Sequence, residues 1–276
     1  MNRPTADAIE TEEHGPVRMV AINRPQKRNA LDLVARESLA AAVQEAIDDK
    51  EVRAIVLTGR GGHFCAGGDI TSMRSAEPMT AEAGRSRMRD TLKNAERIYG
   101  SDKVVIAAVE GCAYGGGFGL ALLADLVIAS TSARFCMSFS KVGLVPDNAS
   151  LFTLPRIVGL QRAKEIMFSA RELDAAEAKA LGIATEVVDE GTALQRALAV
   201  AQGIATASPA AIAMTKTALN RSLSSDLATM IELESAAQGI AFSSGYHRDA
   251  IDRFITRRPM KFTWPELVTS ARERDH

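Results

Sequence analysis

The sequence predicts an α/β protein built on a parallel sheet, and three observations support this class. Short β-branched runs, which are typical of buried strands, recur between residues 17 and 188. Between them lie longer stretches whose apolar residues repeat at helical spacing. From residue 192 onward the pattern is helical throughout. Strand, helix and strand therefore alternate several times, which favours a parallel α/β core followed by a helical region.

The elements can be placed in chain order. Residues 1–16 are polar and acidic without an apolar run, so we expect a disordered N-terminus. The first expected strand, residues 17–23, ends at Arg24-Pro25, and Asp32 is a suitable N-cap for a helix that runs to about residue 48. Residues 71–82 are polar and rich in methionine and alanine, which suggests a mobile cover over a pocket.

The remaining elements follow from β-branched runs and from helical spacing. Further strands are expected at residues 53–59, 104–109, 126–129, 134–136 and 184–188. Further helices are expected at residues 85–97, from 120 onward, and at 151–158, 161–168 and 174–181. The chain is thus divided into a disordered N-terminus (1–16), a core (17–191) and a C-terminal helical region (192–276).

The composition argues against several classes of binding partner. The 276 residues are 46% hydrophobic with a formal net charge of −1, so the chain can bury one sizeable core and has no global attraction for nucleic acid or an anionic membrane. The N-terminus has no apolar signal region, and no apolar run is long enough to span a bilayer. Three cysteines without a C-x-x-C pair indicate buried thiols in a reducing, cytoplasmic compartment. The four histidines are scattered, so no metal site is expected.

Two glycine-rich corners are the candidate functional loops of the sequence. Residues 111–119 join the strand at 104–109 to the next helix, and residues 61–70 follow the strand at 53–59. Such corners let backbone approach a ligand closely and leave N–H groups unpaired, so two of them can hold one oxyanion. Leu120 stands where the last glycine of a dinucleotide fingerprint belongs, and there is no P-loop. The alternative is a pair of tight turns that serve only helix packing.

At these corners the chain resembles the crotonase (enoyl-CoA hydratase/isomerase) superfamily. The resemblance rests on residues 22–25 with 29–31, on 64–70 and on 107–117, and it extends from about residue 17 to residue 262. It implies a spiral of ββα units with a C-terminal helical trimerisation region. It also implies a coenzyme A thioester as substrate, no separate cofactor, and the N–H groups of Gly68 and Gly116 as the oxyanion donors. A homotrimer or a dimer of trimers is expected.

The resemblance fails at the two hydratase carboxylates. Their positions are occupied here by Gly119 and Phe139, so addition of water by the usual route is disfavoured. A different carboxylate, Asp147, stands before the helix at 151–158, where the similar 3,2-enoyl-CoA isomerases and the ring-epoxide isomerase carry an acid/base. We therefore expect Asp147 to move a proton between C2 and C4 of a 3-enoyl-CoA, giving the 2-enoyl isomer. The alternative role for Asp147 is a helix N-cap.

The resemblance also assigns the substrate contacts. Those for coenzyme A are Lys27, Arg28, Ala66, Asp69, Ile70, Tyr114, Lys261 and Phe262. Lys261 and Phe262 are expected at the adenine end, either of the same chain's substrate or of a substrate bound by a neighbouring subunit. Met137 and Phe139 are expected to shape the acyl pocket. The ordinary alternative for each lysine or arginine is a surface charge.

Several other activities stay open. Residues 147–159 are also similar to the 4-chlorobenzoyl-CoA dehalogenases, but a histidine base and a tryptophan at the position of Phe139 are missing. Hydratase-like activity, thioester hydrolysis and a non-catalytic acyl-CoA-binding or RNA-binding role are further alternatives. The RNA-binding alternative rests on a basic stripe, Arg85, Arg89, Lys93 and Arg97, which is otherwise a solvated helix face. Neutral net charge argues against nucleic acid.

Overall fold

The computed structural model describes residues 8–74 and 79–266. Its centre is a six-stranded sheet in the order β1-β2-β3-β4-β6-β9. Its strands are β1 (Ile9–His14), β2 (Val17–Ile22), β3 (Ala54–Gly59), β4 (Val104–Val109), β6 (Leu126–Ser130) and β9 (Glu186–Val188). All neighbours pair in parallel except β1, which is antiparallel to β2. The expected parallel α/β core is confirmed.

A small second sheet lies beside the first and consists of β5 (Cys112–Tyr114), β7 (Arg134–Cys136) and β8 (Glu172–Asp174). β5 and β7 are parallel, whereas β8 returns antiparallel to β7. Because β5 begins three residues after β4 ends, the chain turns from one sheet into the other at the second glycine corner. This turn places the corner between two layers.

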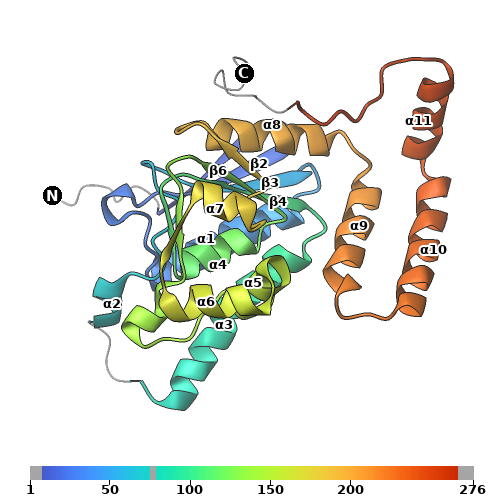
Figure 1. Ribbon diagram of the computed structural model, residues 1–276. Coiled ribbons are helices and arrows are strands. Elements are labelled where there is room, and N and C mark those ends of the chain that lie inside the picture. The colour runs from blue at the N-terminus through green and yellow to red at the C-terminus, as the bar shows by residue number, and fades with distance from the viewer. Residues whose placement is uncertain (1–7, 75–78, 267–276) are drawn as a thin grey trace.

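Both faces of the large sheet are buried, which explains the continuous apolar strands. On β4, Val105, Ala107 and Val109 pack into the main core, and the alternate residues pack into a second core on the opposite face. Helices α1 (Leu33–Asp48) and α4 (Gly116–Leu122) contribute to the main core, and α8 (Ala193–Ala205) covers the opposite face (Figure 1). The helix predicted from Asp32 is confirmed, because its carboxylate accepts a hydrogen bond from the Ala35 N–H.

The remaining helices surround the main core or extend from it. They are α2 (Ile70–Arg74), α3 (Ala81–Gly100), α5 (Ser150–Val158), α6 (Leu160–Ser169), α7 (Ala175–Ala180), α9 (Pro209–Ser222), α10 (Leu227–Ser243), α11 (Gly245–Ile255) and the 3-10 turns η1 (Pro25–Lys27) and η2 (Ser138–Val142). Of the expected cover at 71–82, residues 75–78 lie outside the described part of the chain.

Two expected boundaries are wrong. The N-terminal segment is not disordered through residue 16, because residues 9–14 form the edge strand β1. Its acidic residues obscured the strand, yet Glu10 and Glu12 pair with Arg60, and Glu13 pairs with Arg18.

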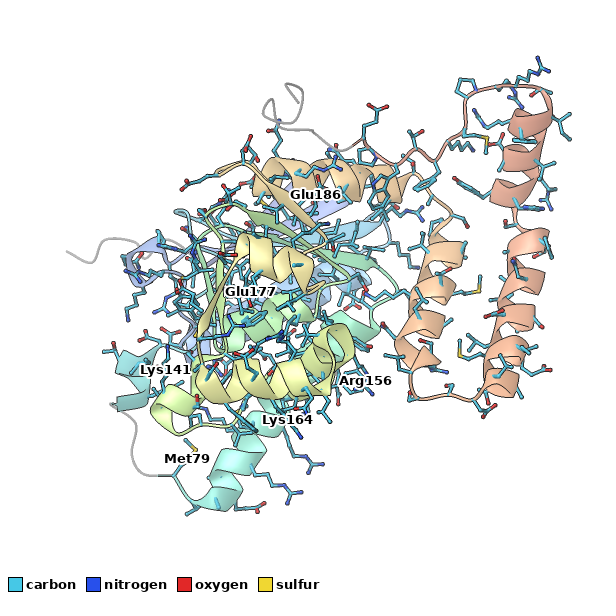
Figure 2. The ribbon with its side chains drawn as sticks, in the orientation of Figure 1. Met79, Lys141, Arg156, Lys164, Glu177 and Glu186 are labelled. Atoms are coloured by element: carbon cyan, nitrogen blue, oxygen red, sulfur yellow. The ribbon has the colours of Figure 1, made fainter. Side chains whose placement is uncertain are left out.

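The second wrong boundary lies at residue 192, because α8 belongs to the core and not to the peripheral helices. Arg196 of α8 donates to Glu186 of β9 at 2.9 Å, a buried pair that fixes the helix to the sheet. Glu186 is labelled beside α8 in Figure 2. Helices α9, α10 and α11 extend away from the body (Figure 1). Within the described ranges no single helix is long and apolar enough to cross a membrane, although α8 and α9, bent by 111°, pass such a test as a pair.

Candidate active site

The two glycine corners pack directly against each other. Cys65 forms an isolated parallel bridge with Ala113, in which the Cys65 N–H donates to the Cys112 carbonyl and the Tyr114 N–H donates to the Cys65 carbonyl, both at 2.9 Å. A Cβ on Gly117 would lie 2.1 Å from the Cys65 carbonyl oxygen, so only glycine fits there. The sequence thus brings two loops, separated by about fifty residues, into backbone contact.

At this contact two N–H groups, those of Gly68 and Gly116, have no acceptor in the described part of the chain. Gly68 forms an isolated bridge with Leu31, but the bonds of that bridge use Gly67 and Asp69, and the Gly68 N–H points elsewhere. Gly116 opens α4 and likewise donates to no acceptor in the described part of the chain. A Cβ on Gly67 would lie 3.3 Å from the Gly116 nitrogen, which shows how closely the loops approach. Two such donors suit a developing oxyanion.

Asp147 lies next to these donors and is not a helix cap. Helix α5 begins at Ser150 with Ala149 at its N-cap, and no side chain caps it. Oδ1 of Asp147 is buried without a hydrogen-bond partner, and it lies 3.2 Å from where a Cβ on Gly116 would be. Burial raises the pKa of this carboxyl, an effect that the nearby Arg36 partly offsets. Asp147 is therefore a carboxyl that folding leaves unsatisfied at the glycine corners.

The backbone after Asp147 adopts a left-handed turn that holds it in place. Asn148 and Ala149 have φ angles of 49° and 55°, which non-glycine residues adopt only at some cost in energy. The Asn148 amide donates to the Gly116 carbonyl at 2.8 Å and so ties this turn to the glycine corner. Sequence reasoning missed Asn148, because its only signal is its place beside Asp147.

A cavity of about 520 Å³ opens from this site. Gly67, Gly116 and Asn148 line it at the glycine corners, and α1 and α3 supply much of the remaining wall. Arg36 of α1 is among these residues, and its guanidinium lies 2.9 Å from where a Cβ on Gly68 would be. Sequence reasoning also missed Arg36, since nothing in the sequence shows which face of α1 is turned toward the corner.

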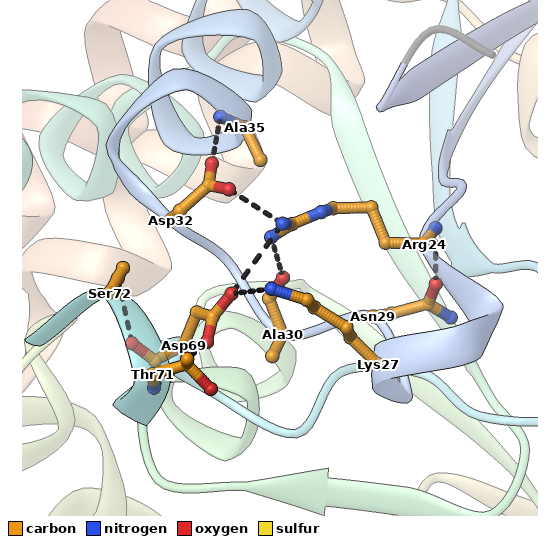
Figure 3. A network of polar contacts seen from close by, with 9 residues as sticks. All are labelled: Arg24, Lys27, Asn29, Ala30, Asp32, Ala35, Asp69, Thr71 and Ser72. Atoms are coloured by element: carbon orange, nitrogen blue, oxygen red, sulfur yellow. Dashed lines mark hydrogen bonds and ion pairs between the residues drawn. The ribbon is translucent and has the colours of Figure 1, made fainter. Parts of the chain in front are cut away.

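Asp69 anchors the first glycine corner through buried ion pairs (Figure 3). Its carboxylate accepts from Lys27 at 2.6 Å and lies 3.5 Å from Arg24, which also pairs with Asp32. The hydrogen bond from Lys27 is the main cause that lowers the pKa of Asp69. The network joins η1, the start of α1 and the start of α2 at one point.

Comparison with known proteins identifies the family. The sequence profile of the enoyl-CoA hydratase/isomerase family matches residues 12–265. The chain belongs to this family, the crotonases. A short-chain-enoyl-CoA hydratase of Clostridium acetobutylicum is 35% identical over 251 residues, which are 91% of this chain and 95% of that protein. A 1,2-epoxyphenylacetyl-CoA isomerase of Escherichia coli is 34% identical over 249 residues, or 90% and 95% of the two proteins.

A solved structure supports the same assignment. An enoyl-CoA hydratase/isomerase from Cupriavidus metallidurans superposes with a TM-score of 0.90 at 40% identity, covering 96% of this chain and 100% of that one. The crotonase fold expected from the sequence is therefore confirmed. The chain is an acyl-CoA enzyme of this family, and its relatives carry the names of both hydratases and isomerases.

The structure leaves no room for a side chain at Gly119, the position at which the resemblance implied a glutamate in the hydratases. A Cβ there would lie 2.8 Å from the Asn148 Cβ and 3.1 Å from the Asp147 carbonyl oxygen. The turn that carries Asp147 thus fills the space that a side chain at 119 would need. The second position, Phe139, is a buried aromatic ring.

The residues expected to contact coenzyme A fall into three groups. Arg28, Ala66 and Ile70 lie on the two loops at the first corner, with Arg28 and Ile70 exposed, while Lys27 and Asp69 are paired with each other. The Tyr114 hydroxyl contacts Glu172 on β8. Lys261 instead pairs with Asp249 of α11, and Phe262 lines a separate cavity beside α9. Within one chain these last two are not brought to the glycine corners.

The expected acyl-pocket residues lie in the core. Met137 and Phe139 are buried there, and neither lines the cavity, whose wall comes largely from α1 and α3. In the described ranges no group of three or more histidine, cysteine, aspartate or glutamate side chains could hold a metal ion.

Proposed function

We propose that this crotonase isomerises a 3-enoyl-CoA to the 2-enoyl-CoA, with Asp147 as the single acid/base. The observation that carries the proposal is the Asp147 carboxyl, whose Oδ1 is buried and unpartnered beside Gly116. Neither residue at the two hydratase positions, Gly119 or Phe139, can act on water. The isomerase named among the relatives is consistent with this choice.

The mechanism transfers one proton and consumes no other reagent. The Asp147 carboxylate removes a proton from C2, and the electron pair of that C–H bond moves into the thioester to form a dienolate. The N–H groups of Gly68 and Gly116 donate to the dienolate oxygen, where each such donor typically contributes about 3 to 4 kcal/mol to the transition state. Protonated Asp147 then returns the proton at C4, which leaves the double bond between C2 and C3.

The raised pKa of Asp147 suits both halves of this transfer. A general acid/base works best when its pKa lies close to the operating pH, which is above the ordinary pKa of an aspartate. Burial of Asp147 disfavours its charged form, which strengthens the base, and leaves the acid ready to donate in the second step. Because no hydrogen bond fixes Oδ1, the carboxyl can turn from C2 toward C4.

Product analysis of Asp147→Asn tests the proposal. The wild type should convert 3-enoyl-CoA to 2-enoyl-CoA without forming 3-hydroxyacyl-CoA, as shown by chromatography. Asp147→Asn should lose roughly 10²- to 10⁴-fold in kcat, the usual contribution of a general acid/base. It should still bind a saturated acyl-CoA. Asp189→Asn, at an exposed position outside the site, should match the wild type. Formation of 3-hydroxyacyl-CoA, or an unimpaired Asp147→Asn, would refute this assignment.

We also propose that the chain assembles as a trimer through its C-terminal helices. Helices α10 and α11 bury none of their residues within the single chain. Their exposed large apolar residues are Leu227, Ile231, Ile240, Phe242, Ile251, Phe254 and Ile255. An apolar surface of this kind supports association with further copies of the chain.

A further inference from the structure

The wall of the cavity is apolar over most of its area, with Leu31, Leu39 and Leu120 among its residues, but it is polar along α3. Helix α3 supplies Ala83, Ser86, Arg87, Thr91, Asn94 and Arg97 to this wall. All but one of these side chains are polar or charged. A plain alkyl chain lying against them would bury polar groups without partners, which is unfavourable. The composition of α3 therefore indicates an acyl group that is itself polar.

The charged residues that line the cavity indicate that the polar acyl group is negatively charged. Three arginines line it, Arg36 of α1 and Arg87 and Arg97 of α3, against one carboxylate, the exposed Glu37. Asp147 faces the glycine end, where Arg36 is the charge that acts on it. Arg87 and Arg97 are thus the cations left for the rest of the cavity.

Two of these three arginines, Arg36 and Arg87, differ from other arginines of the protein in having no polar partner among the described residues. Arg18, Arg24 and Arg196, which are buried or half-buried, each pair with a carboxylate. By contrast, Arg36 and Arg87 are half-buried, yet neither side chain forms a hydrogen bond or an ion pair with any residue in the described ranges. A partly buried cation without a counter-charge is costly, and a bound anion relieves that cost.

A neutral group in the same wall is also unsatisfied. The Oδ1 of Asn94 is buried with no hydrogen-bond partner, and it stands on α3 between Arg87 and Arg97. A carboxamide can turn to present either its oxygen or its NH₂ group, so Asn94 can donate to an anion placed between the two arginines.

From these contacts we propose that the acyl group of the substrate carries a second carboxylate, bound by Arg87 and Arg97. The substrate class is then the mono-coenzyme A thioester of a dicarboxylic acid. This inference rests on the proposed function in one respect, namely that the acyl group occupies this cavity with its thioester at Gly68 and Gly116. The distal carboxylate replaces the missing counter-charge and leaves Arg36 to act on Asp147.

Equilibrium binding of a matched pair of thioesters tests the proposal without any turnover. Adipoyl-CoA and hexanoyl-CoA have acyl groups of six carbons and differ in whether the far end is a carboxylate or a methyl group. Titration calorimetry with the wild type should show at least ~10-fold tighter binding of adipoyl-CoA, because its carboxylate forms charge-assisted hydrogen bonds that a methyl group cannot form. Since both ligands contain coenzyme A, contacts with its phosphates cancel.

Substitutions on α3 test which of its arginines bind the distal carboxylate. Arg87→Gln and Arg97→Gln should each reduce the preference for adipoyl-CoA, and the double variant should abolish it while hexanoyl-CoA still binds. Arg85→Gln is the matched control, because Arg85 is exposed on the same helix and does not line the cavity. It should keep the wild-type preference.

Three results would overturn the proposal: equal or tighter binding of hexanoyl-CoA, a preference that survives in the double variant, or 6-hydroxyhexanoyl-CoA binding as tightly as adipoyl-CoA. The last result would mean that the wall recognises a neutral polar end. Binding does not require Asp147 to act as a base, so failure of the isomerase assignment would leave this preference intact. Loss of the preference would in turn leave the isomerase assignment standing.

Discussion

At the scale of single residues, the proposed mechanism depends on one carboxyl, Asp147, and one guanidinium, Arg36. Two effects act on the pKa of Asp147: burial raises it, and the charge of Arg36 lowers it. Burial is the larger effect, so the carboxyl stays protonated to a higher pH than an exposed aspartate. Arg36 forms no ion pair with any carboxylate in the described ranges, so its charge is available to act on Asp147 over a longer distance.

Replacing Arg36 should therefore shift the pH dependence of the reaction. Asp147 must be deprotonated to act as a base, so kcat/KM falls as the pH drops through its pKa. In Arg36→Gln the lowering effect is lost, the pKa of Asp147 rises, and the acid limb of the pH profile should move to higher pH. Arg36→Lys keeps the charge and should restore the wild-type limb. A limb that stays in place in Arg36→Gln would show that Asp147 is not the titrating base.

At the scale of elements, the site is a contact between α4 and the turn before α5. Gly119 on α4 lies against the backbone of residues 147–148, and the Asn148 amide bonds to the Gly116 carbonyl. The position of Asp147 is therefore set by how closely the two elements approach. Glycine at 119 permits that approach.

Gly119→Ala should displace Asp147 by pushing these elements apart. The added Cβ would lie 2.8 Å from the Asn148 Cβ, and overpacking of this kind typically costs about 1 to 3 kcal/mol in the free energy of unfolding. We expect lower stability in urea and a large loss of kcat. The control is Gly84→Ala on α3, where a Cβ meets nothing within 4 Å. An active and fully stable Gly119→Ala would show that the turn is free to move.

The same elements show what the sequence could reveal. Strand β4 was predicted at its observed bounds because burial of both faces makes every residue apolar. Strand β1 was missed because an edge strand exposes charged residues, and β8 because two of its three residues, Glu172 and Asp174, are acidic. All four residues of the basic stripe of α3 are exposed, and of these four only Arg97 lines the cavity.

The site was predictable only where its residues lie in local motifs. The two glycine corners and Asp147 stand next to strands and a helix start, so motif and position made them candidates, and the structure places Asp147 beside Gly116. Arg36, Arg87 and Asn94 come from the middle of helices, and whether they face the cavity depends on how α1 and α3 are rotated in the fold. That rotation results from long-range packing, which one sequence does not display.

At the scale of the whole molecule, the main body and the C-terminal helices differ in what they bury. The body encloses two apolar cores on either side of one sheet. Helices α9, α10 and α11 project from it, and Phe254 on α11 is 76% exposed (Figure 1). Single exposed apolar residues are ordinary, but a run of them along two helices supports the proposed association through this surface.

Charge substitution on α11 should therefore break the assembly. Light scattering coupled to size-exclusion chromatography should give the wild type three times the chain mass, or six times if trimers pair. The double variant Phe254→Glu with Ile255→Glu buries two charges in the proposed interface, and its mass should fall to that of one chain. Phe168→Glu is the matched control, because Phe168 on α6 is also 76% exposed but belongs to the body. A single-chain mass for the wild type would refute the trimer. If only Phe168→Glu lowered the mass to that of one chain, the contact would instead lie on the body, and α10 and α11 would need another partner.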